Sequence, residues 1–135
     1  MATSRPIVFP YGIVCGRPSP VATVGIFING RWRVVELYVD TGAFYTLLHV
    51  QFATDFGLDF KRGRKVLAQV GDGGLIPVHL HKLMMQIGDT QFVTEVGFSE
   101  KLGVSFNLLG RLGVFEHFKI CFHEKRKVVS FEVVD

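Results

Sequence analysis

The sequence has few of the residues that mark several common classes of protein. Its 135 residues include only two cysteines, Cys15 and Cys121. Two cysteines can form at most one disulfide, and neither has the spacing of a metal-binding or redox motif. We therefore expect two reduced thiols in a reducing compartment.

Long hydrophobic runs and targeting signals are also missing. No apolar stretch approaches the length that is needed to cross a membrane. The N-terminus lacks the basic, then apolar, then small-residue order of a signal peptide. These absences predict a cytoplasmic protein that has no membrane partner.

The charge is only mildly basic, with a formal net charge of +3. The basic residues gather in two segments, 61–65 and 125–127. Neither segment has interleaved aromatic residues that could stack on nucleic-acid bases. We therefore expect solvated turns at these positions and no nucleic-acid partner.

Apolar residues, in contrast, are abundant. Hydrophobic residues make up 48% of the chain, and phenylalanine alone occurs 13 times. The chain is long enough for one core and too short for two ordinary domains. One small core cannot easily hide this much apolar surface, so we expect some of it to face a partner.

Proline is concentrated at the start of the chain. Four of the five prolines, Pro6, Pro10, Pro18 and Pro20, lie in residues 1–20. Proline excludes a helix or a central strand there, which predicts an extended N-terminal arm that runs over the surface. A single domain is then expected over residues 21–135.

The rest of the chain has the pattern of an all-β protein with one or two short helices. Alternating apolar residues predict strands separated by glycine-rich turns, and Asn29-Gly30 is a strong hairpin signal. Leu48, Phe52 and Phe56 recur every four residues and predict a short helix that ends at Gly57, and a second short helix is expected around Phe115. Strands are expected at 21–28, 34–39, 45–48, 66–70, 75–87, 91–98, 104–109, 119–123 and 128–134.

An acidic residue stands at the end of one predicted strand. Residues 34–39 should place Val35, Leu37 and Val39 on an inward face, and Asp40-Thr41-Gly42-Ala43 follows directly. Gly42 allows a sharp bend, and its N–H and the Thr41 hydroxyl are short donors that can orient a carboxylate. On its own, an Asp-Thr-Gly sequence is better explained as an Asx turn that ends a strand.

A second feature is the segment Gly71-Asp72-Gly73-Gly74, which joins two predicted strands. Such a tip is small, polar and mobile, so the hairpin could open and close over a bound molecule. No Gly-Lys-Ser or Gly-Lys-Thr follows it, which excludes a phosphate-binding loop.

Other kinds of site have little support. His79 and His81 would share a face of one strand, but no third ligand with suitable spacing is visible. No Gly-x-Ser-x-Gly motif is present, and Cys15 lies in the proline-rich arm. We therefore predict no metal, no cofactor and no serine or cysteine nucleophile.

The motifs together resemble the retropepsin-like aspartic proteases, in a cellular or prokaryotic form. The resemblance covers about residues 21–134 and rests on Asp40-Thr41-Gly42-Ala43-x-x-Thr46, on the glycine-rich tip and on Leu108-Leu109-Gly110-Arg111. It implies a small closed β-barrel in which Asp40 is catalytic. It further implies an active-site turn of Thr41, Gly42 and Ala43, a substrate-binding wall and flap of Phe44, Gly71, Asp72, Gly73 and Gly74, and structural support from Thr46, Leu108, Leu109, Gly110 and Arg111.

Two positions depart from the pattern of the viral members. Those members have an acidic residue directly after Asp-Thr-Gly-Ala, which pairs with the arginine, and an Asp or Asn after that arginine. Here these positions hold Phe44 and Leu112. Arg111 then needs another acceptor, such as a backbone carbonyl or a nearby carboxylate, or the dimer is built differently. Phe44 would make the substrate-facing wall apolar, which predicts a preference for hydrophobic side chains beside the cut bond.

Peptide hydrolysis of this kind needs two carboxylates, and the chain has one in the right setting. No second Asp-Thr-Gly or Asp-Ser-Gly occurs. A two-fold homodimer would bring the two copies of Asp40 together and would use the surplus apolar surface. We therefore expect an aspartic endopeptidase that acts on a peptide or protein substrate, with a bell-shaped pH dependence and an acid optimum. The alternative is an inactive domain of the same fold that serves in dimerisation or peptide binding.

Overall fold

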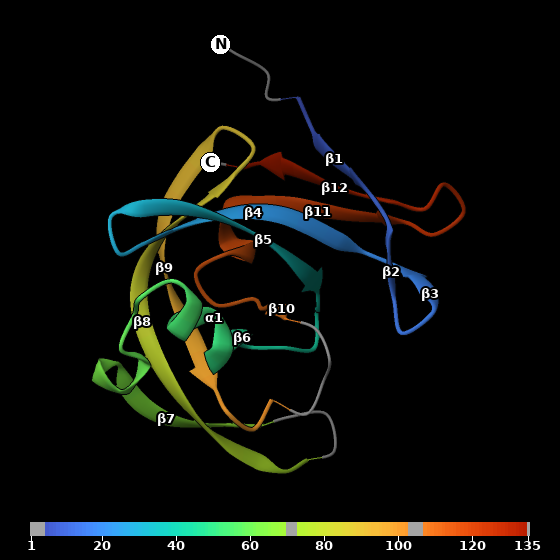
Figure 1. The fold of residues 1–135 in the computed structure, drawn as a ribbon. Coiled ribbons are helices and arrows are strands. Elements are labelled where there is room, and N and C mark those ends of the chain that lie inside the picture. The colour runs from blue at the N-terminus through green and yellow to red at the C-terminus, as the bar shows by residue number, and fades with distance from the viewer. Residues whose placement is uncertain (1–4, 70–72, 103–106, 135) are drawn as a thin grey trace.

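The structure is a computed structural model, and it describes residues 5–69, 73–102 and 107–134 (Figure 1). Strands dominate these residues, so the all-β prediction is confirmed. In chain order the strands are β1 Ile7–Pro10, β2 Gly12–Val14, β3 Arg17–Ser19, β4 Val21–Ile28, β5 Arg31–Val39, β6 Thr46–His49, β7 Arg64–Gln69, β8 Leu75–Ile87, β9 Thr90–Ser99, β10 Leu108–Leu109, β11 Phe118–His123 and β12 Val128–Val133. The helical elements are α1 Val50–Asp55 and the two 3-10 turns η1 Phe60–Arg62 and η2 Phe115–His117.

The largest sheet closes on itself. Its strands lie in the order β4-β5-β10-β6-β9-β8-β7, and β4 also pairs with β8. This extra pairing turns six of the strands into a ring, with β7 attached to β8 outside it. Alternate residues point into the ring, as the predicted period of two requires. In β5 these are Val35, Leu37 and Val39, all of which are buried, and this prediction is confirmed.

The β4–β5 connection has the turn that its sequence predicts. Asn29 and Gly30 both have positive φ, 51° and 78°. Two consecutive residues in this region form the hairpin turn whose twist matches that of the flanking strands. The turn sets the register that pairs Val21 with Tyr38, and so fixes where β5 ends.

The N-terminal segment contains three of the strands. β1 pairs with β12 in a separate three-stranded sheet of order β1-β12-β11, and β2 pairs with β3 in a two-stranded sheet. The prolines are compatible with these positions because all three strands lie at sheet edges, where a missing N–H costs no ladder bond. The segment that was predicted as an extended arm is therefore paired along much of its length.

Two apolar clusters fill the structure. The larger lies within the ring and under the β1-β12-β11 sheet, with Phe98 and Phe131 among its fully buried side chains. The smaller joins the β7–β8 hairpin to β6 and β10. The helix expected near 48–56 is confirmed as α1, and the one expected around Phe115 is only the 3-10 turn η2. Within the described residues, no helix has the length and apolar character of a membrane span.

Candidate active site

Asp40 lies directly beyond the end of β5, in a tight turn. The Gly42 N–H donates to Asp40 Oδ1 at 2.8 Å, and the Ala43 N–H donates to the Asp40 carbonyl at 3.2 Å. The first bond fixes the direction of the carboxylate, and the second closes the turn. Asp40 is half-buried, whereas Thr41 and Gly42 are exposed. The turn therefore presents an oriented carboxylate at the surface of a single subunit.

The two-residue strand β10 pairs with the strands on both sides of this turn. It runs parallel to the end of β5 and antiparallel to β6, so Leu108 lies between Tyr38 and Leu47. The Asp40 N–H donates to the Leu109 carbonyl at 3.1 Å. Since β5 enters the turn and β6 leaves it, β10 holds both of its sides.

A buried hydrogen bond then ties Gly110 to the second side of the turn. The Gly110 N–H donates to Thr46 Oγ1 at 3.1 Å, and both residues are buried. The two following N–H groups donate to the turn itself, Arg111 to the Ala43 carbonyl at 3.0 Å and Leu112 to the Phe44 carbonyl at 2.8 Å. Residues predicted to support the turn are therefore bonded to it through the backbone.

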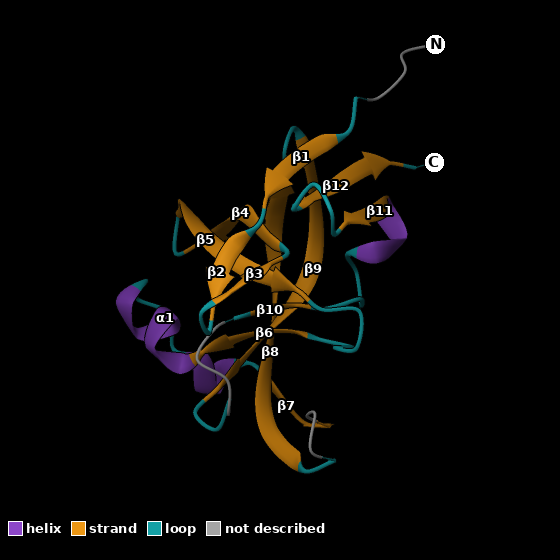
Figure 2. Cartoon of the chain, turned by 90° about the vertical axis from the view of Figure 1, so that its right-hand side faces the viewer, coloured by secondary structure: helices purple, strands orange, loops and turns teal. Residues whose placement is uncertain are grey.

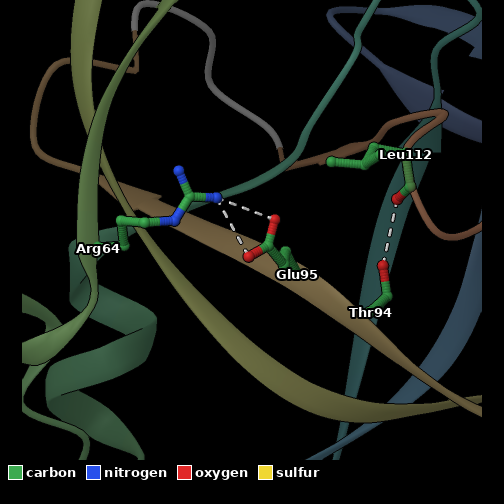
Figure 3. A network of polar contacts seen from close by, with 4 residues as sticks. All are labelled: Arg64, Thr94, Glu95 and Leu112. Atoms are coloured by element: carbon green, nitrogen blue, oxygen red, sulfur yellow. Dashed lines mark hydrogen bonds and ion pairs between the residues drawn. The ribbon is translucent and has the colours of Figure 1, made fainter.

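At a greater distance from Asp40, β9 holds the segment that follows β10 (Figure 3). Thr94 is buried, and its hydroxyl donates to the Leu112 carbonyl at 3.1 Å. The next residue, Glu95, accepts two hydrogen bonds from Arg64 at 3.2 and 3.3 Å. Neighbouring residues of one strand thus connect the segment after β10 on one side and the base of the β7–β8 hairpin on the other.

Arg111 has a partner that the sequence analysis did not foresee. Its guanidinium carbon lies 5.8 Å from the centre of the Phe44 ring, and Phe44 in turn packs edge-on against Tyr45 at 5.0 Å. This cation–π contact was not among the expected partners, which were a backbone carbonyl or a nearby carboxylate. The residue that stands where viral members have the acid therefore still contacts the arginine.

We expect this contact to stabilise the turn by about 0.5–1 kcal/mol, the range for exposed cation–π pairs. Unfolding of Phe44→Leu, Arg111→Gln and the double variant in urea, at one fixed protein concentration, measures the coupling. Phe44→Tyr is the matched control and should retain it. Additive losses in the double variant would show that the two side chains do not interact.

The β7–β8 hairpin is where the flap was expected. Gly71 and Asp72 lie outside the described residues, whereas Gly73 and Gly74 are both exposed. Gly73 has a φ of +86°, and a Cβ there would meet no atom within 4 Å. The tip thus has a backbone that favours glycine and open space around it.

The hairpin also carries two apolar residues that the sequence analysis did not single out. Leu67 and Leu75 are exposed on one face, while Ala68 and Ile76 on the other face are buried in the smaller cluster. The sequence does contain a signal for these exposed leucines, because residues of both strands alternate between the two faces with a period of two. The leucines were not predicted to be exposed because the sequence pattern alone did not show which face of the hairpin is buried.

The remaining candidates do not gather at Asp40. His79 packs against the Phe60 ring, and His81 Nε2 lies 2.8 Å from the Phe60 carbonyl oxygen. In the part of the chain that is described, no three His, Cys, Asp or Glu side chains are grouped to hold a metal ion. A pocket of about 200 Å³ is lined in part by His79, and its lining includes no residue of the Asp40 turn.

Comparison with solved structures identifies the fold. A retropepsin-like aspartic protease from Rickettsia conorii superposes with a TM-score of 0.65 and 19% sequence identity, covering 93% of this chain and 98% of that one. EIAV protease complexed with the inhibitor HBY-793 gives a TM-score of 0.53 and 18% identity, covering 70% and 84%. No family model and no curated protein sequence matches the chain. The chain therefore has the fold of the retropepsin-like aspartic proteases.

Proposed function

We propose that this protein is an aspartic endopeptidase whose active site forms between two copies of the chain. The observation that carries the proposal is the Asp40 carboxylate, which is held by the Gly42 N–H at 2.8 Å at the end of β5. The fold shared with the Rickettsia conorii and EIAV proteases supports it. An Asx turn that only ends a strand would not need the buried support of β10 and Gly110.

In this proposal the two Asp40 carboxylates share one proton and hold a water molecule between them. The ionised carboxylate takes a proton from the water as its oxygen attacks the peptide carbonyl. The protonated carboxyl group donates a hydrogen bond to the carbonyl oxygen. The proton taken from the water later passes to the peptide nitrogen as the C–N bond breaks. No metal or cofactor takes part in these steps.

The requirement for a second copy follows from the sequence and from the exposure of the turn. No second Asp-Thr-Gly or Asp-Ser-Gly is present. Thr41 and Gly42 are exposed, and Phe44 keeps 50% of its surface accessible. A two-fold axis beside Thr41 would cover these residues and bring the carboxylates together. The β7–β8 hairpins would close over an extended peptide, which Phe44 would contact through its exposed face.

The features that favour an inactive domain are the missing acid at position 44 and an Arg111 that consequently needs another partner. The Phe44 ring supplies that partner at 5.8 Å. The Asp-Thr-Gly sequence, the bond from Gly42 and the backbone bonds from residues 110–112 leave the turn intact. We therefore favour the enzyme over the binding module.

Catalysis should depend on assembly, which gives the direct test. Cleavage of a mixed peptide library at mildly acid and neutral pH, with and without an aspartic-protease inhibitor, first provides a substrate. Its rate is then measured over a dilution series together with mass in solution. We expect the rate per chain to fall in step with the fraction of dimer, because a single subunit has only one of the two carboxylates. A strict monomer that still cleaves the peptide would refute the shared site.

A further inference from the structure

The β2–β3 hairpin, residues 12–19, is set apart from the rest of the structure. It forms its own two-stranded sheet and contacts other elements only weakly. It stands out from the side of the molecule toward which β5 runs, and Figure 2 looks onto that side. An isolated two-stranded hairpin is at best marginally stable in water, so its strands would gain from a surface to pack on.

One end of the hairpin is fixed to the β11–β12 turn. The Tyr11 N–H donates to the Lys127 carbonyl at 2.8 Å, and the Tyr11 hydroxyl donates to Glu124 Oε1 at 3.3 Å. The hydrogen bond from Lys127 Nζ, at 2.8 Å, keeps the pKa of Glu124 below its ordinary value. Glu124 is therefore ionised at neutral pH and can accept from both partners.

The other end is fixed beside the Asp40 turn. The Pro20 carbonyl, which follows β3 directly, accepts from the Val39 N–H at 2.9 Å. Val39 is the last residue of β5 and precedes Asp40. A Cβ on Gly12 would lie 3.4 Å from the Val21 side chain, so the first strand of the hairpin also runs close to β4. Both ends are thus held, and the second end lies one residue from the carboxylate.

Between these anchors the hairpin exposes an apolar face. Ile13 is 71% exposed and pairs across the strands with Pro18, which is also exposed. Directly opposed residues of an antiparallel pair share one face. Cys15 and Gly16 form the tip, with φ of 51° and 76°. Ile13 and Pro18 therefore form an exposed apolar pair on a hairpin whose two ends are hydrogen-bonded to the rest of the chain.

We propose that the β2–β3 hairpin clasps the second copy of this chain, with Ile13 and Pro18 buried against the partner subunit. This inference rests on the proposed function. If two Asp40 carboxylates meet at a two-fold axis, the elements that begin next to Asp40 lie beside that axis and face the partner. The hairpin begins there, and its apolar face supplies the kind of surface that dimer interfaces bury.

The test is the dimer dissociation constant of Ile13→Asp, measured by sedimentation over a dilution series. The matched control is Val34→Asp, which places the same charge at an equally exposed apolar position, since Val34 is 72% exposed. Val34 lies six residues before Asp40, about 20 Å along an extended strand. We expect Ile13→Asp to raise the dissociation constant about tenfold or more, or ~1.4 kcal/mol, because a carboxylate would be buried without a partner. Val34→Asp should stay within about twofold of the parent.

Three other outcomes would contradict the proposed clasp. Unchanged dimerisation of Ile13→Asp, with a parent that dimerises and cleaves, would overturn the clasp and leave the shared active site standing. Unchanged dimerisation with a higher KM for peptide would make the hairpin part of the substrate cleft instead. A parent that stays monomeric at all concentrations would overturn the clasp and the shared site together.

Ile13→Ser, which adds no charge, should raise the dimer dissociation constant by a smaller factor than Ile13→Asp does.

Discussion

Replacing Asp40 by asparagine is expected to lower peptide cleavage by about a thousandfold or more without unfolding the protein. Asparagine has the same shape, and its Oδ1 can still accept the Gly42 N–H that Asp40 accepts at 2.8 Å. It carries no charge and cannot take a proton from water, and general acid–base groups commonly contribute factors of 10²–10⁴. The measurement is kcat/KM for a cleaved peptide, together with mass in solution and the urea unfolding curve.

Asp89→Asn is the matched control for this variant. Asp89 is exposed in the turn between β8 and β9, so the same chemical change there should leave cleavage unaffected. Equal rates for Asp40→Asn and the parent would end the protease proposal. Loss of both dimer and fold in Asp40→Asn would assign the carboxylate a structural role instead.

Mixing the two proteins tests whether the site is shared. Subunits that exchange will form dimers with one Asp40 and one asparagine, and such dimers hold only one of the two carboxylates. An excess of Asp40→Asn should therefore suppress the activity of the parent. If each subunit contained a complete site, the parent's activity would be unchanged by the addition.

The sequence could predict those parts of the fold that depend on local signals. The inward face of β5 follows from the alternation of Val35, Leu37 and Val39, and the β4–β5 turn follows from Asn29-Gly30. In both cases a few consecutive residues decide the backbone conformation. The turn at Asp40 belongs to this group, because Gly42 both permits the bend and supplies the N–H that orients the carboxylate.

The features that could not be predicted depend on residues far apart in the sequence. β10 has only two residues, too few to show a period, and its place between β5 and β6 is a tertiary arrangement. The pairing of β1 with β12 joins the two ends of the described chain. The prolines exclude a central strand from the first 20 residues, but they say nothing about which edge those residues join.

Side-chain partners show the same limit. The sequence places Phe44 beside the acid and leaves Arg111 without the carboxylate that the viral pattern supplies. The resemblance links the two positions through the acid of the viral members, but the ring of Phe44 itself was not expected as the partner of Arg111. Only the hydrogen bonds from residues 111 and 112 to residues 43 and 44 bring the guanidinium over the ring. The partner of a surface cation is therefore set by backbone pairing that composition does not reveal.

Replacing Gly110 by alanine is expected to destabilise the protein by about 3 kcal/mol or more and to abolish cleavage. A Cβ on Gly110 would lie 2.8 Å from the Thr46 nitrogen and closer still to the Tyr45 carbonyl. These are backbone atoms of the strand that leaves the turn, so a side-chain rotation cannot relieve the clash. The free energy of unfolding in urea measures the loss.

Gly25→Ala is the matched control, since its Cβ would meet the half-exposed Trp32 ring at 3.3 Å and the ring can shift. It should cost less than about 1 kcal/mol. A Gly110→Ala protein as stable and active as the parent would show that the segment after β10 is free to move away from β6. The turn would then not depend on the Gly110–Thr46 bond, and the orientation of Asp40 would have to come from the Gly42 N–H alone.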